Sequence, residues 1–270
     1  MKKYVSAGFA AVLLLMLLCG CAKTPIAFTK GSHPRDDVYA ATFQTQYATE
    51  DSVTLHVASA IFTEEIARQT LAAIQADYAK IGKLLTDAQP VTVYAVEQTI
   101  AGVPQVMGSQ VFCTLDDIAG GQYRDSLARA ALGSPFPWQG IGISRLAFEG
   151  VPDTEALKAY YGDEANLGTL SMFAPYFMPD FADADAIAIA RDTAAAVAAF
   201  AIGKDAKGFA ASGGSTEIRQ QWLESIGASA AYPTDDVTLA VDSMTFDAAG
   251  EYPLILTGAS RGFISRPTIT

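Results

Sequence analysis

Apolar and polar residues alternate along the first third of the chain in the way that β-strands require. In residues 52–58 apolar side chains stand at every second position, which predicts a strand with one buried face. The apolar run at residues 91–96 predicts a second strand. Residues 106–115 predict a third, with Gly108 as a candidate bulge. The first part of the domain is therefore expected to build a sheet.

A helical repeat separates the first two predicted strands. Thr63 is a suitable N-cap for a long helix. Ile66, Ile74 and Ile81 recur at helical spacing, so these three side chains are expected on the buried face of that helix.

Helical spacing dominates the middle of the chain. Four helices are expected there, at residues 119–132, 141–149, 183–202 and 216–227. Residues 237–241 and 252–257 then have the pattern of strands, and the turn residues between them suit a hairpin. The sequence thus predicts an α+β fold with an N-terminal mixed sheet and its long helix, a central helical subdomain and a C-terminal β-hairpin.

Residues 1–20 have the layout of a secretory signal peptide, with two lysines, an apolar run and a small-residue end. The run is about 15 residues long, short of the roughly 20 that a membrane-spanning helix needs. Its end, Leu18-Cys19-Gly20-Cys21, resembles the lipobox of bacterial lipoproteins. That resemblance implies cleavage before Cys21 and attachment of acyl chains to Cys21, and two or more chains anchor a protein stably.

The lipobox resemblance divides the chain into three parts. Residues 1–20 are the signal peptide, residues 21–37 are the lipidated N-terminus with a tether, and residues 38–270 form a single extracytoplasmic domain. The membrane is then a partner through the lipid anchor, and the domain faces the periplasm or the cell surface. The alternative is an ordinary signal peptide or an uncleaved anchor.

The acidic composition limits the classes of partner. The formal net charge is −11, and loss of Lys2 and Lys3 with the signal peptide brings it to −13. Such a chain repels nucleic acid, so no nucleic-acid partner is expected. After cleavage and lipidation Cys113 is the remaining free cysteine, and its apolar neighbours indicate a buried, inert thiol.

A Gly-x-Ser-x-Gly at residues 258–262 raises the alternative of a serine hydrolase, with Ser260 as nucleophile and His56 as base. A nucleophile elbow needs a helix after the turn and a histidine that follows the serine in the chain. Both histidines, His33 and His56, precede Ser260. The same stretch resembles the nucleotide turn of short-chain dehydrogenases, but Pro267 interrupts the residues where the helix belongs.

No cofactor or metal is expected from the motifs. The sequence has no His-x-x-x-His and no Cys-x-x-Cys. Asp180, Asp183 and Asp185 stand at the start of a predicted helix, where acidic residues favour the helix dipole.

Aromatic residues suggest a second alternative, a solute-binding lipoprotein with an aromatic-lined groove. The loop at residues 172–181 contains Tyr176 and Phe177, and Trp138 follows another proline-rich turn. Clustered aromatic side chains of this kind line many ligand sites.

The order of the predicted elements, ending in Arg145-Leu146-Ala147-Phe148-Glu149-Gly150, resembles a gluzincin metallopeptidase domain. In that family one helix carries His-Glu-x-x-His, and a later helix ending in Glu-Gly supplies another zinc ligand. Here the first motif is replaced by Tyr123-Arg124-Asp125-Ser126-Leu127, which lacks both imidazoles and the glutamate. The resemblance implies a scaffold without its metal that still binds a peptide in the old cleft, where Tyr123 and Glu149 are candidate contacts.

These observations favour a lipid-anchored cell-envelope protein with a non-catalytic binding or scaffolding role and a peptide or protein partner. The chain lacks a zinc motif and a complete catalytic triad, so the sequence leans away from an enzyme.

Overall fold

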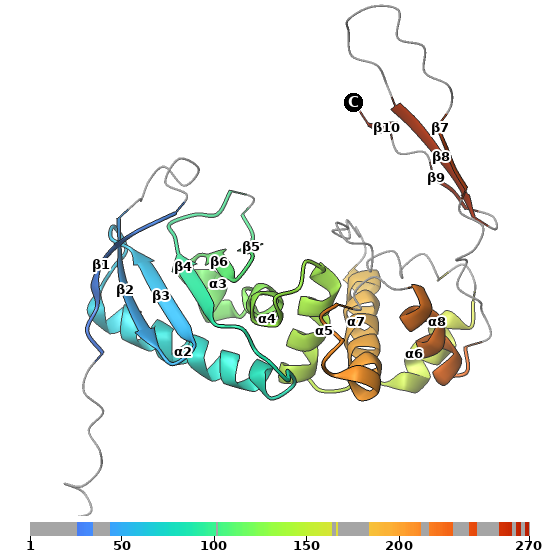
Figure 1. Cartoon of the computed structure of the whole chain (residues 1–270), viewed down its shortest axis with the longest axis horizontal. Coiled ribbons are helices and arrows are strands. Elements are labelled where there is room, and N and C mark those ends of the chain that lie inside the picture. The colour runs from blue at the N-terminus through green and yellow to red at the C-terminus, as the bar shows by residue number, and fades with distance from the viewer. Residues whose placement is uncertain are drawn as a thin grey trace, which may run out of the picture.

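The structure, a computed structural model, describes residues 26–34, 44–100, 102–163, 166, 184–211, 216–228, 238–241, 254–260, 263–265 and 268–269. These residues form an α+β fold, as predicted, with a six-stranded mixed sheet, a long helix against it and a group of further helices beyond (Figure 1).

The six-stranded sheet has the order β1-β2-β3-β4-β6-β5. Its strands are β1 (Thr29–Ser32), β2 (Gln44–Glu50), β3 (Val53–Ala58), β4 (Val91–Ala95), β5 (Gln105–Met107) and β6 (Gln110–Cys113). The central strands β3, β4 and β6 run parallel, whereas β1, β2 and β5 are antiparallel to their neighbours. The sheet therefore has two antiparallel edges, β1 and β5.

Helix α2 (Glu64–Gly82) connects β3 to β4 and covers one face of the sheet (Figure 1). Ile74 and Ile81 are fully buried in this layer, as predicted. The prediction for Ile66 is wrong, because its side chain is 41% exposed and the buried face of the helix runs through the neighbouring Ala67 instead.

An aromatic row crosses the other face of the sheet. The strand register places Tyr47, His56, Tyr94 and Phe112 side by side on four neighbouring strands. Their ring centroids are 4.8, 4.7 and 5.0 Å apart in that order. His33 lies against this row, with its ring 5.1 Å from Tyr94 and 5.3 Å from Phe112.

Part of the predicted tether belongs to the folded domain. Thr29–Ser32 form β1 and pair with β2, and the ring of Phe28 packs edge-on against Phe62 with centroids 5.5 Å apart. The fold therefore starts before residue 38. The sequence did not predict this strand because its four residues, TKGS, lack apolar alternation.

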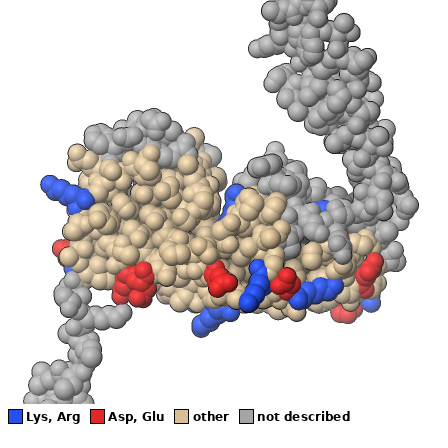
Figure 2. All heavy atoms as spheres, viewed as in Figure 1, with Lys and Arg blue, Asp and Glu red and all other residues tan. Residues whose placement is uncertain are grey.

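The remaining helices are α3 (Leu115–Gly120), α4 (Arg124–Leu132), α5 (Pro137–Phe148), α6 (Thr154–Tyr161), α7 (Ala184–Asp205) and α8 (Thr216–Ser225). The helix expected at 119–132 is two helices, because Gly121 ends α3 in the left-handed conformation with a φ of 78°. On the face seen in Figure 2, charged side chains gather mainly along the edge that the helices form.

Close packing joins α4, α5 and α7. A Cβ at Gly140 would lie 2.5 Å from the carbonyl oxygen of Asp125 in α4. A Cβ at Gly142 would lie equally close to the carbonyl oxygen of Ala194 in α7. Glycine at these two positions of α5 therefore lets its backbone approach both neighbouring helices.

A second sheet follows the helices. It contains β7 (Thr238–Val241), β8 (Leu254–Ser260), β9 (Phe263–Ser265) and β10 (Thr268–Ile269). β7 and β8 pair antiparallel, as expected for the predicted C-terminal hairpin.

Candidate functional site

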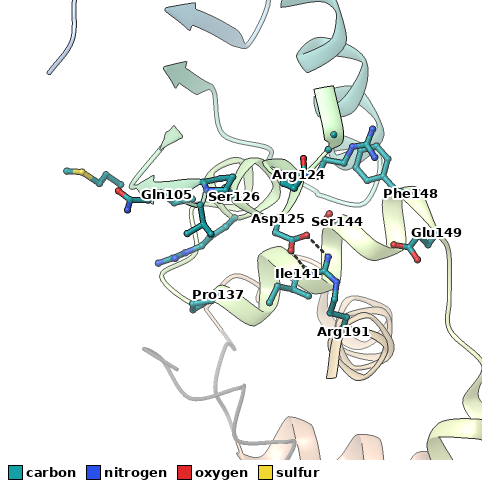
Figure 3. Close-up of a pocket in the computed structure, with 18 residues that line it drawn as sticks. Gln105, Arg124, Asp125, Ser126, Pro137, Ile141, Ser144, Phe148, Glu149 and Arg191 are labelled. Atoms are coloured by element: carbon teal, nitrogen blue, oxygen red, sulfur yellow. Dashed lines mark hydrogen bonds and ion pairs between the residues drawn. The ribbon is translucent and has the colours of Figure 1, made fainter. Parts of the chain in front are cut away.

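A cleft with a volume of about 920 Å³ lies between the edge strand β5 and the helices α4 and α5 (Figure 3). One wall is the segment Val103–Met107, and the other is made by the end of α3, by α4 and α5, by Glu149 and by one residue of α7, Arg191. The cleft therefore borders the edge of the main sheet on which, among the described residues, no further strand pairs with β5.

The turn between β5 and β6 determines which backbone N–H and C=O groups of β5 point outward from the sheet. Met107 pairs with Gln110 across Gly108 and Ser109, and Gly108 has a φ of 58°. A two-residue turn with such a glycine first is a type II′ turn, whose closing pair exchanges its backbone hydrogen bonds. Because the pattern alternates, the N–H and C=O of the next residue, Val106, point away from β6. Gly108 thus forms a tight turn rather than the bulge considered from the sequence.

An ion pair forms the floor of the cleft. The guanidinium of Arg191 donates to both carboxylate oxygens of Asp125, at 2.7 and 3.1 Å (Figure 3). Burial alone would lower the pKa of Arg191, but the hydrogen bond and charge of Asp125 outweigh it and raise that pKa. The paired charges join α7 to α4 through two charge-assisted hydrogen bonds.

The carboxylate of Asp77 in α2 holds the start of α4 in place through two hydrogen bonds. Its Oδ2 accepts from the hydroxyl of Tyr123 at 2.9 Å and from Nε of Arg124 at 2.8 Å. The guanidinium carbon of Arg124 lies 4.1 Å from the centre of the Phe148 ring. Burial, followed by the charge and hydrogen bond of Asp77, raises the pKa of Tyr123, so its hydroxyl stays neutral.

The binding residues predicted from the sequence are only partly brought together. Glu149 lines the cleft, where it pairs with Arg145 at 2.6 Å. Tyr123 is fully buried beneath the cleft, and Trp138 is 1% exposed and packs edge-on against Phe209. Neither side chain is available to a ligand in the way the sequence suggested.

Two further candidates, Tyr176 and Phe177, lie outside the described residues, as does the whole aromatic loop at residues 172–181. The structure therefore gives no geometry for the groove of the solute-binding alternative. Cys21, the predicted lipidation site, also lies outside the described part of the chain.

The serine-hydrolase alternative lacks the local structure of an elbow. Ser260 is the last residue of β8 and pairs with Phe263, the first residue of β9. The next described element after β8 is thus another strand, β9, whereas an elbow leads from a strand into a helix. His56 belongs to the other sheet, where its Nδ1 is 2.9 Å from the hydroxyl of Thr45.

Cys113 is completely buried, and burial followed by the charge of Asp117 raises the pKa of its thiol. Within the described ranges, no group of three or more His, Cys, Asp or Glu side chains is placed to hold a metal ion. In the same part of the chain, no helix has the length and apolar character needed to cross a membrane.

The chain matches no protein-family model, and no curated protein matches it. The site therefore rests on its own residues. Sequence reasoning missed Asp125, Arg129 and Arg191, since 66 positions separate the ion-paired residues and no local pattern connects them.

Proposed function

We propose that this chain is a lipid-anchored protein of the bacterial cell envelope, facing outside the cytoplasm, that binds an extended peptide segment in the cleft without catalysing a reaction. The observation that carries the proposal is the open edge of β5 beside the cleft. An unpaired strand edge offers backbone hydrogen bonds to an added strand, which is a recurrent mode of peptide recognition.

The surroundings of β5 favour a partner. Val103 and Met107 are 47% and 44% exposed, and Ile100 on the preceding loop is 57% exposed. Apolar side chains grouped beside an open strand edge gain free energy when a partner removes them from water. A peptide strand paired with Val106 would cover the side chains on either side of it.

The charged groups of the cleft support binding rather than catalysis. Asp125 is held by Arg191, and Glu149 is held by Arg145, which also bonds to Asp192 at 2.5 Å. A general base needs a carboxylate or imidazole that can accept a proton near neutral pH. The carboxylates of Asp125 and Glu149 are already engaged by arginine side chains, so they hold the helices of the cleft together.

The gluzincin resemblance supports the same proposal. It places the lost zinc motif at residues 123–127, which begin α4, and α4 forms the wall of the cleft facing β5. In this chain the segment holds helices together instead of binding a metal. Arg124 joins α4 to α2, and Asp125 joins α4 to α7.

Replacement of Val106 by proline tests peptide binding. Peptides would be selected from a displayed library of random nine-residue sequences with the full-length protein in detergent, and their affinities measured by fluorescence polarisation. Val106→Pro removes the N–H at the open edge, so the affinity should fall at least about tenfold. Thr29→Pro, at the start of the opposite edge strand, should change it little. No selection by the wild-type protein, or equal affinity in Val106→Pro, contradicts the proposal.

Replacement of Cys21 tests the anchor. Cys21→Ala removes the thiol to which lipid attaches, so the protein should move from the membrane fraction to the soluble fraction. Cys19→Ala is the matched control and should leave the protein in membranes. Unchanged membrane retention of Cys21→Ala would contradict lipidation at this residue.

A further inference from the structure

Arg129 differs from the other two arginines of the cleft in how its charge is compensated. Arg124 bonds to Asp77, and Arg191 bonds to Asp125. The guanidinium of Arg129 donates from Nε to the carbonyl oxygen of Ser134 at 3.2 Å and from Nη2 to that of Pro135 at 2.8 Å. Among the described residues, no carboxylate forms an ion pair with it.

The two carbonyls hold the guanidinium of Arg129 in place without neutralising it. Burial lowers the pKa of Arg129, which is the expected result when a charge is removed from water without a counter-charge. A positioned guanidinium with an uncompensated charge is a receptor for a carboxylate, because such bonds are short and strong.

Arg129 also lies near one end of β5. The N–H of Gln89 donates to the carbonyl of Ala131 at 2.7 Å, and the N–H of Thr92 donates to that of Ser109 at 3.0 Å. The C-terminal part of α4 and the turn that ends β5 therefore both lie beside the start of β4. An added strand antiparallel to β5, the more stable arrangement, has its N-terminal half at this end. Its C-terminal carboxylate lies at the other end.

We infer that Arg129 is the specificity-determining residue of the cleft and that it receives the side-chain carboxylate of an aspartate or glutamate in the bound peptide. The inference rests on the proposed function, because it requires a peptide strand along β5. Apolar residues of the peptide then pack on Val106 and Ile141, which line the same cleft.

The test uses the full-length protein and two displayed libraries of random nine-residue peptides, one with free C-termini and one fused at its C-terminus to a carrier. The wild-type protein should enrich Asp or Glu at one position in both libraries. Changing that acidic residue to its amide should weaken binding about tenfold. Arg129→Met retains the apolar stem and should abolish the preference, whereas Arg129→Glu should shift it to Lys or Arg.

Arg68→Met is the matched control, because Arg68 pairs with Glu64 on α2 and lies outside the cleft. It should keep the acidic preference, as should Arg129→Lys, which keeps the charge. Melting temperatures would establish that each variant is folded, and the amide-substituted peptide tests the carboxylate on wild-type protein alone.

The outcomes separate the inference from the proposed function. Selected peptides that depend on Val106 but show no acidic preference overturn the inference and leave peptide binding intact. An acidic preference that survives in Arg129→Met also overturns it. If binding peptides are enriched only in the library with free C-termini, Arg129 binds the terminal carboxylate of the peptide. That result overturns the inference that it binds the side chain of an aspartate or glutamate. If neither library yields a binder, peptide binding itself fails.

Discussion

The two edges of the six-stranded sheet are built differently. The residues of β1 are TKGS, with Lys30 exposed and no apolar side chain. Gly31 is needed because a Cβ there would lie 2.8 Å from Cδ1 of Tyr47. A short, polar edge with an exposed lysine discourages further strands from pairing. The β1 edge therefore closes the sheet.

The β5 edge has the opposite character. Its strand is also short, but Val103 and Met107 expose apolar side chains, and α4 forms a wall beside it. Proteins usually protect such an edge, and in the described part of the chain no strand pairs with this one, which is consistent with the proposed peptide partner. The two ends of the sheet thus differ in composition: β1 has the features that discourage an added strand, and β5 has the features that the proposed peptide binding requires.

The largest effect should come from removing the support beneath the β5 cleft. Asp77→Ala leaves the buried hydroxyl of Tyr123 and the guanidinium of Arg124 without their shared acceptor. Loss of one partner of a buried pair costs about 3–5 kcal/mol, and Arg124 is partly exposed, so the free energy of unfolding should fall by about 3 kcal/mol.

Urea unfolding followed by circular dichroism measures this change. Asp87→Ala is the control, because Asp87 is exposed, and it should stay within about 0.5 kcal/mol of the wild type. Equal stabilities of the two variants would show that Asp77 does not support the cleft.

A smaller effect should follow from separating the helices of the cleft. A Cβ in Gly140→Ala would lie 2.5 Å from the carbonyl oxygen of Asp125 and 2.7 Å from Cβ of Arg129. α5 must then move away from α4, which should destabilise the protein by about 2 kcal/mol. It should also weaken peptide binding at β5.

Gly203→Ala gives the matched control in another helix. A Cβ there meets nothing within 4 Å, so alanine should stabilise α7 by about 0.5–1 kcal/mol through its helix propensity. Thermal unfolding of both variants measures the difference. A shift of the same sign in the two would contradict the close approach of α4 and α5.

The sequence predicted the sheet, the long helix and the hairpin because each depends on local spacing. Ile74 and Ile81 are buried where the repeat requires, and Thr63 accepts from the N–H of Ile66 as an N-cap. Gly108 was correctly singled out, but a single glycine does not distinguish a bulge from a turn.

The cleft could not be predicted in the same way. Tyr123 stands where a cleft residue was expected, but a hydrogen bond to Asp77, 46 positions earlier, keeps it buried. Arg129 has a local sequence like that of any helical arginine. Its significance comes from the carbonyls that hold it and from the absence of a carboxylate partner in the described part of the chain, and both depend on tertiary packing.

The smallest expected effect is a loss of stability in acid that arises on the β1 side of the sheet. His56 lies between the rings of Tyr47 and Tyr94, and burial, followed by the charge of His33, lowers its pKa to about 4. The ordinary pKa is about 6.5, so between these values the unfolded chain binds the proton and the folded chain does not. Stability should therefore fall as the pH drops from about 6.5 to about 4, and remain unaffected by this residue above that window.

Comparison of the wild type with His56→Gln isolates this loss. Carboxylates also titrate in acid, but they do so in both proteins and cancel in the difference. Because His56 is only partly buried, the wild type should lose on the order of 1 kcal/mol more than His56→Gln between pH 7 and pH 4. Urea unfolding at several pH values measures it. Identical losses would mean that protonation of His56 between the two tyrosine rings costs no stability. The β1 side of the sheet would then show no specific response to acid.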